Sequence, residues 1–214
     1  MKNSNSLNRF ILIINVLCFV LTCSAQNYTR YVNPFVGTGA HGHTFPGAIV
    51  PFGAVQLSPD TRLNGWDGCS GYHYDDNTIY GFSHTHLSGT GCSDYGDILV
   101  MPFVGNGSPV NTHYCSQFSH TDEVAHPGYY SVKLANGVLA EMSATSHVGC
   151  HRYTFPDNGQ PHGIVVDLAH RDIVLDSYIE TIDKQDFVGA RISKAWNENQ
   201  HIYFYMKLSA PVTR

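Results

Sequence analysis

The sequence YYSVKLANGVLAEMSAT, residues 129–145, alternates apolar and polar side chains on both sides of an asparagine–glycine pair. Such alternation is typical of half-buried β-strands, and Asn-Gly favours a tight hairpin turn. We therefore predict two antiparallel strands, Tyr129–Leu134 and Val138–Thr145, joined by Ala135–Gly137.

Strand signals continue toward the C-terminus, whereas helical periodicity is hard to find after residue 26. Four further strands are predicted over 148–155, 163–168, 187–196 and 200–209. The largely apolar run 163–168 is typical of a strand buried on both faces, and the strongly apolar 203–208 segment favours a neighbour on each side. Many short strands separated by turn signals predict a mainly β fold, an antiparallel β-sandwich.

The first residues have the composition of an export signal. Two basic residues precede an apolar stretch over 10–21, which only Asn15 interrupts, and the small-residue site 23–25 follows. The apolar stretch is shorter than the roughly 20 residues that span a bilayer. We predict a secretory signal peptide over residues 1–25, so that the mature chain, 26–214, is exported to the periplasm or the extracellular space.

A lipid anchor is the alternative fate of the N-terminus. Cys23 could be the lipidated cysteine of a bacterial lipoprotein, but Thr22 before it suits that signal poorly, so anchoring ranks second. The remaining cysteines are Cys69, Cys92, Cys115 and Cys150. They contain no CxxC spacing, and the sequence leaves open three disulfide pairings or free thiols.

Composition narrows the class of ligand. The net charge is −5, only 14% of residues are charged, and lysine and arginine are scattered along the chain. Nucleic-acid binding is therefore not expected. Thirteen histidines and thirteen tyrosines are in excess, and both side chains hydrogen-bond neutral hydroxyls while presenting a ring. A neutral polar ligand is favoured.

The run from residue 31 to 102 concentrates glycine, histidine, aromatic and short acidic residues. Glycine allows close backbone approach, and Trp, Tyr and His supply flat surfaces with polar edges, a combination that suits sugars. Trp66 is the residue we single out, because an indole in the loop GWDGC, 65–69, is better placed to contact a ligand than to cap a sandwich.

Two histidine pairs are candidate metal ligands. His41 and His43, and likewise His84 and His86, are two positions apart, so on strands each pair would share a face and could supply two metal ligands. Neither pair has an Asp or Glu placed beside it in the sequence, so we expect them to orient loops. A metal-dependent hydrolase ranks a distant third among the functions considered.

Four carboxylates in the same run are candidate acids and bases for glycosidic bond hydrolysis: Asp60, Asp67, Asp94 and Asp97. Short acids in glycine-rich loops more often accept bonds from backbone amides, which is the role we favour. Ser88 lacks the GxSxG pattern of a serine hydrolase, and GTGCSDYGD, 89–97, lacks the lysine of a phosphate loop.

Several long segments occur in a familiar order and spacing from about Tyr31 to Leu208: VNPFVGTG, HGHTFPGA, VPFGAVQLSPDTR, GWDGCSGYHY, GFSHTHLSGTGCSDYGD and SKAWNENQHIYFY. This series resembles the start of the family 92 glycoside hydrolases, bacterial exo-acting α-mannosidases. The resemblance implies an N-terminal β-sandwich that packs against a larger C-terminal helical-barrel domain, with the active site in the cleft between them.

The resemblance also implies a mechanism that lies mostly outside this chain. In the family, calcium engages the O2 and O3 hydroxyls of the terminal mannose, a glutamic acid protonates the leaving oxygen and an aspartate activates water. Inversion requires carboxylates roughly 6.5–9.5 Å apart. These groups belong to the barrel domain, so we assign no catalytic residue and no metal ligand here.

By position in the family segments, the residues implied in binding the terminal mannose are Trp66, Asp67 and Cys69, with His84 and His86 as supporting residues. We expect the chain to be the N-terminal part of a calcium-dependent exo-α-mannosidase acting on mannose-containing glycans. Its domain 26–214 is expected to be incomplete at the C-terminal end and inactive alone. The alternative is a stand-alone carbohydrate-binding β-sandwich, and linkage preference is not predicted.

Overall fold

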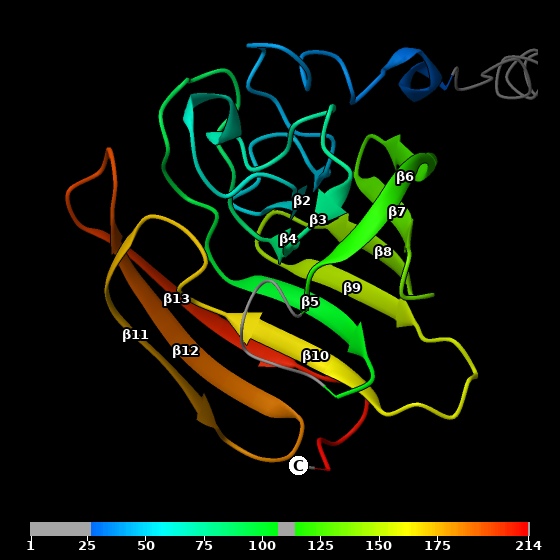
Figure 1. Ribbon diagram of the computed structural model, residues 1–214. Helices are drawn as coiled ribbons and strands as arrows, with labels where there is room; N and C mark the ends of the chain where they lie inside the picture. Colours follow the sequence, from blue (N-terminus) through cyan, green and yellow to red (C-terminus); the bar gives the residue numbers. More distant parts are fainter. Residues whose placement is uncertain (1–26, 107–113, 214) are drawn as a thin grey trace, which may run out of the picture. The chain divides into compact units, whose positions relative to one another are not determined.

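The computed structural model describes residues 27–106 and 114–213 (Figure 1). The predicted signal peptide and the alternative anchor at Cys23 lie outside the described residues. The chain divides into two units, one ending at Tyr31 and one beginning at Val32. The described part of the first unit holds the short 3₁₀ helix η1 (Tyr28–Tyr31). No helix within the described ranges is both long and apolar enough to cross a membrane.

The second unit is built almost entirely of antiparallel strands, beginning with a five-stranded sheet in the order β1-β2-β4-β5-β10. Its members are β1 (Ala48–Ile49), β2 (Gln56–Asp60), β4 (Gly81–Ser83), β5 (Leu99–Val104) and β10 (His162–Asp167). Several of these strands are short because glycine and proline interrupt the segment that supplies them.

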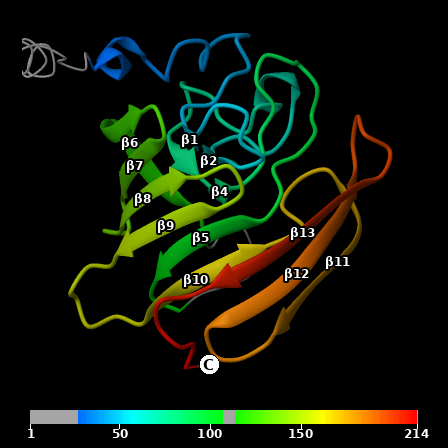
Figure 2. The ribbon, with the colours of Figure 1, turned by 180° about the vertical axis from the view of Figure 1, so that it is seen from behind.

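A second five-stranded sheet has the order β3-β6-β7-β8-β9. Its members are β3 (Thr78–Ile79), β6 (Ser116–His126), β7 (Tyr129–Leu134), β8 (Leu139–Ala144) and β9 (Gly149–Thr154). Buried Leu57 and Phe82 of the first sheet share one core with Tyr130, Val132 and Met142 of the second. This shared core makes the two sheets the layers of a sandwich, as the sequence predicts (Figure 2).

A third sheet has the order β11-β12-β13, with β11 (Ile173–Thr181), β12 (Asp186–Lys194) and β13 (Gln200–Lys207). Arg191 of β12 fixes it to the first sheet by donating a 2.5 Å hydrogen bond to Asp97, just before β5. Both side chains are fully buried. Within the described ranges β13 pairs with β12 alone, so the predicted neighbour on its second side is not found there.

The hairpin prediction is confirmed with the expected chemistry. Strand β7 has the predicted bounds, and β8 and β9 lie within the predicted ranges. Gly137 has a φ of 90°, a left-handed value that glycine adopts readily, and its amide donates to the carbonyl of Leu134 at 2.9 Å. Strands β12 and β13 also match, within two residues, the ranges predicted around 197–199.

The prediction for 163–168 is wrong in one respect. The segment does form β10, paired with β5, but most of its residues are only partly buried. The reason is its position, because β10 is an edge strand of its sheet within the described residues. An apolar run alone does not distinguish a central strand from an edge strand.

Candidate functional site

Trp66 begins the short 3₁₀ helix η2 (Trp66–Gly68), and its side chain is 59% exposed. Gly65 precedes it with a φ of 81°, and the turn is closed by hydrogen bonds from Gly68 to Gly65 and from Cys69 to Trp66. The left-handed residue turns the chain so that the indole faces outward rather than into the core. This exposure is compatible with the predicted ligand contact, which stays a prediction.

Asp67, the next residue of η2, is bonded by the histidines of a loop far away in sequence. His41 Nδ1 donates to Asp67 Oδ1 at 2.7 Å, and His43 Nε2 donates to the same oxygen at 3.2 Å. The hydrogen bond from His41 is the main reason that the pKa of Asp67 is lowered, with His43 contributing in the same direction. The carboxylate is therefore held in its ionised form beside Trp66.

The histidine loop is tightly constrained. A Cβ on Gly42 would lie 2.1 Å from the carbonyl oxygen of Gly37, so glycine is the residue that fits there. His43 itself has a φ of 54°, an uncommon value for a residue with a side chain. Buried His73 donates from Nε2 to the carbonyl of Ala40 at 3.0 Å and tethers the loop from behind.

The indole of Trp66 packs against both histidine rings. The ring centroids are 5.0 Å apart for His41 and 4.4 Å apart for His43, which meets the indole edge to face. Gly91 lies against the indole nitrogen, because a Cβ there would be 3.0 Å from Trp66 Nε1. The rotation of the exposed indole is thus limited by His41, His43 and Gly91.

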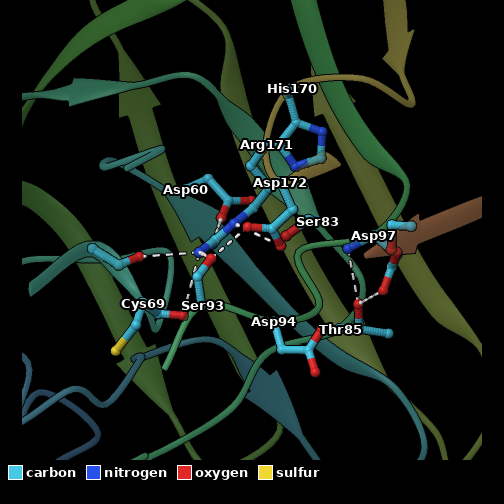
Figure 3. A network of polar contacts seen from close by, with 12 residues as sticks. Asp60, Cys69, Ser83, Thr85, Ser93, Asp94, Asp97, His170, Arg171 and Asp172 are labelled. Carbon is cyan, nitrogen blue, oxygen red and sulfur yellow. Dashed lines mark hydrogen bonds and ion pairs between the residues drawn. The ribbon is translucent and has the colours of Figure 1, made fainter. Parts of the chain in front are cut away.

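Arg171 is hydrogen-bonded to the end of η2, and Figure 3 shows it beside Cys69 and Ser93. Its Nη2 donates to the carbonyls of Gly68 at 3.3 Å and Cys69 at 3.4 Å, and to Ser93 Oγ at 3.0 Å. Its Nη1 lies 3.7 Å from Asp60 Oδ1, with both side chains buried. A cation near the last carbonyls of a helical turn is favourable. Arg171 therefore links the turn that carries Trp66 to the first sheet.

Asp60 lies at the centre of this buried network. Burial opposes its ionisation, but His86, His170 and Arg171 together outweigh that cost and lower the pKa to about 2. A carboxyl group with such a pKa stays ionised at neutral pH and cannot serve as a general acid. The structure thus gives Asp60 a structural role.

His84 and His86, the second histidine pair, contact different groups. His84 donates from Nδ1 to the carbonyl of Ile98 at 2.7 Å and lies 3.0 Å from His151 through its Nε2. His86 lies 2.8 Å from the carbonyl of Gln56 through Nδ1 and 3.4 Å from Asp60 through Nε2. Strand β4 ends at Ser83, so His84 and His86 lie beyond it, and each ring is bonded to a backbone carbonyl.

The proposed supporting roles of His84 and His86 in sugar binding stay predictions, and so does the role of Cys69. Cys69 is 2% exposed, and burial raises the pKa of its thiol. Any contribution from Cys69 would come from packing beneath η2. Cys69, Cys92 and Cys150 are free thiols in this structure, in agreement with the free-thiol alternative for these three.

We predicted that the acids of the 31–102 run accept bonds from backbone amides, and most of them do not. Asp94 follows the prediction, since its carboxylate accepts the amide N–H of Asn197 at 3.1 Å. Asp60, Asp67 and Asp97 instead pair with histidine or arginine side chains. The histidine and arginine residues that bond these carboxylates lie 24 to 94 positions away in the chain, which local sequence patterns do not reveal.

Sequence reasoning missed the residues that assemble the site. It discounted His41 and His43 because no acid is adjacent in sequence, yet the fold brings Asp67 to both. It gave Arg171 no role, because nothing in the local sequence distinguishes this buried arginine from an exposed one. Short strands joined by long loops bring these residues together, and loop paths are the part of a fold that sequence patterns describe least.

An exposed aromatic ring beside an ionised, hydrogen-bonded carboxylate is a surface that suits a carbohydrate. Comparison with known proteins gives the family. The family model of the glycosyl hydrolase family 92 N-terminal domain matches residues 31–214. The chain belongs to this family, as the sequence segments indicate.

Solved structures agree with this membership. The family 92 α-mannosidase BT3965 from Bacteroides thetaiotaomicron, in complex with mannoimidazole, is 39% identical with a TM-score of 0.82, covering 88% of this chain and 26% of that one. The family 92 inverting mannosidase BT2199 of the same organism is 25% identical with a TM-score of 0.67, covering 89% of this chain and 31% of that one.

A curated relative adds one point on location. An uncharacterized secreted glycosidase of Arthroderma benhamiae is 34% identical over 155 residues, covering 65% of this chain and 20% of the relative. This chain therefore spans between about a fifth and a third of the length of the relatives described here.

Proposed function

We propose that this chain is the first part of a secreted, calcium-dependent, inverting exo-α-mannosidase that removes terminal mannose from glycans. In this proposal the chain forms one wall of the active-site cleft and is inactive alone. The observation that carries the proposal is the exposed indole of Trp66, packed against the His41–Asp67–His43 cluster in a family 92 domain.

The arrangement suits a sugar ring. An indole presents a flat apolar face to the C–H groups of a pyranose, while carboxylate and imidazole edges bond its hydroxyls. Both histidines donate to Oδ1 of Asp67, so Oδ2 can accept a hydrogen bond from a sugar hydroxyl. Trp66 and Asp67 would then bind and orient the terminal mannose.

The catalytic acid, the catalytic base and the calcium ion are proposed to belong to a C-terminal helical-barrel domain of a longer protein. Calcium takes six to eight oxygen ligands. Among the described residues, the cluster of three or more metal-binding side chains is His41, His43 and Asp67, whose two nitrogens and one carboxylate do not fit calcium. This chain's own contribution is to position the sugar and to exclude water from one side of it.

Activity assays test the proposal. We would compare this chain with a long form that continues through the full length of the family 92 relatives, using an aryl α-mannoside with and without calcium. The long form is expected to release mannose, first as the β-anomer by NMR, and to lose activity on calcium chelation. Appreciable turnover by this chain alone would contradict the assignment of catalysis to the barrel domain.

The alternative, a carbohydrate-binding module, is favoured by the exposure of Trp66 in this chain by itself. Calorimetric titration of the chain with a mannoside separates the two functions. Calcium-independent affinity that Trp66→Ala abolishes would favour the module. Absence of binding by the folded chain, with activity in the long form, would favour the enzyme.

A further inference from the structure

We propose that His41, His43 and Asp67 form a binding site for a divalent transition metal ion of the zinc class. One ligand atom from each of these residues lies within 4.8 Å of the others, and His41 Nδ1 and His43 Nε2 both face Asp67 Oδ1. The proposal goes beyond the mannosidase function and does not depend on it, since it rests on the geometry of these three side chains alone.

The spacing is close to what a tetrahedral ion requires. Zinc binds histidine nitrogen and carboxylate oxygen at about 2.0–2.2 Å, which places neighbouring ligand atoms about 3.4 Å apart. His43 Nε2 and Asp67 Oδ1 are already 3.2 Å apart, and His41 Nδ1 is 2.7 Å from the same oxygen. A small rotation of the exposed His41 ring would open the centre for an ion.

The donor set selects the metal. Two imidazole nitrogens and one carboxylate suit zinc, cobalt or nickel, whereas magnesium and calcium prefer oxygen ligands. On binding, each histidine keeps one ring proton, which moves to the nitrogen that does not face the ion. The negative charge of Asp67 then faces the metal in place of two N–H groups.

The backbone prepares the site. Gly42 packs against Gly37 where a side chain would not fit, His43 is held at a positive φ, and the amide of Gly89 donates to the carbonyl of His43 at 2.6 Å. His73 fixes the loop through Ala40. Preorganised ligands lose little freedom on metal binding, which favours affinity.

The site is open on one side. The His41 side chain is 69% exposed and that of Asp67 is 29% exposed, while His43 is buried. An ion held by three protein ligands with an open side retains positions for water or another small ligand. The site is therefore accessible to metal from solution without unfolding.

Cobalt uptake tests the proposal with a spectroscopic readout. Purified chain, with any affinity tag removed, would be titrated with Co²⁺ and then with Zn²⁺. We expect one equivalent of Co²⁺ to give the visible bands of tetrahedral coordination, Zn²⁺ to displace it, and excess Ca²⁺ to leave it unchanged. A sulfur-to-cobalt charge-transfer band would contradict the proposal, because a cysteine would then be a ligand.

Variants assign the ligands. His41→Ala changes an exposed side chain, so it leaves folding intact, and Asp67→Asn preserves shape while removing the charge. Each should weaken uptake by more than the roughly 10–100-fold typical of losing an outer-shell partner. His147→Ala, at an exposed histidine on another loop, is the matched control and should bind as the parent does.

Each outcome is decisive. Stoichiometric uptake that His41→Ala and Asp67→Asn abolish, and that His147→Ala retains, supports the site. No uptake by chain shown to be folded by circular dichroism, or uptake unaffected by His41→Ala, overturns it and leaves a purely hydrogen-bonded cluster. Failure of mannoside hydrolysis in the long form would not affect this result, so the two proposals fail separately.

Discussion

Arg171 donates a 3.3 Å hydrogen bond to the carbonyl oxygen of Gly68 from 103 positions further along the chain. Gly68 ends the turn that presents Trp66, so the orientation of the exposed indole depends on a buried cation from the segment between β10 and β11. The same guanidinium lies beside Asp60 of β2. The candidate site is therefore built on the sandwich rather than on a free loop.

Arg171→Lys should loosen η2 without unfolding the domain. A lysine ammonium keeps the charge near Asp60 but cannot reproduce the several planar N–H donors that reach Gly68, Cys69 and Ser93. We expect faster hydrogen exchange of the amides of Gly68 and Cys69, read by mass spectrometry. Arg152→Lys, at an exposed arginine, is the control. Equal exchange in both variants would show that Arg171 does not hold the turn.

Gly91→Ala should disturb the indole, whereas Gly89→Ala should not. Both glycines have left-handed backbones, with φ of 69° and 74°, so either alanine costs about 1–2 kcal/mol of stability. Only the methyl group at 91 would meet Trp66 Nε1, at 3.0 Å, while the one at 89 meets nothing within 4 Å.

The readout for this pair is Trp66 fluorescence in a Trp196→Phe background, which leaves Trp66 as the single tryptophan. We expect a shifted emission maximum with Gly91→Ala and an unchanged one with Gly89→Ala. Identical spectra for the two alanine variants would mean that Gly91 does not restrict the indole.

Arg191→Met should be strongly destabilising. It leaves the buried carboxylate of Asp97 without its cation, and breaking a buried pair typically costs about 3–5 kcal/mol. Changing the exposed Arg152, which pairs with Glu141, to Met should destabilise the domain much less, because exposed ion pairs contribute little. Urea unfolding measures both.

A double variant, Arg191→Met with Asp97→Leu, should recover much of that loss, because it removes the uncompensated charge. If the double variant is as unstable as Arg191→Met alone, the cost arises from packing and the third sheet is not held mainly by this ion pair.

Stability should fall as the pH is lowered below about 6.5. Burial lowers the pKa of His84, and it lowers the pKa of His151 well below the usual value, where nearby His84 adds to the effect. Unfolded histidines titrate near 6.5, so on acidification the unfolded chain binds protons first and gains stability relative to the folded chain. The loss begins near pH 6.5 and continues down through the lowered folded pKa values.

Hydrogen bonds also link the two rings in their neutral forms. His84 donates to Ile98, so its Nε2 accepts from His151, which in turn accepts from the hydroxyl of Tyr153 at 2.7 Å. Protonating His84 at Nε2 removes the acceptor for His151, whereas protonating His151 at Nδ1 requires the hydroxyl of Tyr153 to turn and accept. His151→Gln should flatten the pH dependence of the urea midpoint between pH 7 and 5, and His147→Gln should not. An unchanged slope in His151→Gln would assign the acid sensitivity to other groups, such as His170.

The elements predicted from sequence are those whose signals are local. The hairpin at Asn136–Gly137 was recoverable because the turn residues and the flanking alternation lie within one short segment. Strand β6 could not be predicted in this way. Its buried face includes the polar residues Ser116 and Glu123, and its register shifts between Phe118 and Glu123. Buried Glu123 is satisfied by the hydroxyls of Tyr72 and Tyr130, partners that no local pattern reveals.

The same distinction applies to the site. The placement of Trp66 on a loop could be predicted from the glycines that flank the GWDGC segment. The bonds from His41 and His43 to Asp67, and from Arg171 to Gly68, depend on how loops far apart in sequence meet on the sandwich. Sequence patterns describe the residues in each loop but not their meeting point.

The most direct test of the proposed role of this chain is kcat/KM for an α-mannoside in the long form carrying Trp66→Ala. The matched control is Trp196→Ala, which removes the other tryptophan, 75% exposed on the turn between β12 and β13. We predict a loss of at least about tenfold for Trp66→Ala, equivalent to about 1.4 kcal/mol of transition-state binding, and little change for Trp196→Ala. Parent-level kcat/KM in Trp66→Ala would contradict the claim that this chain supplies a wall of the mannose site.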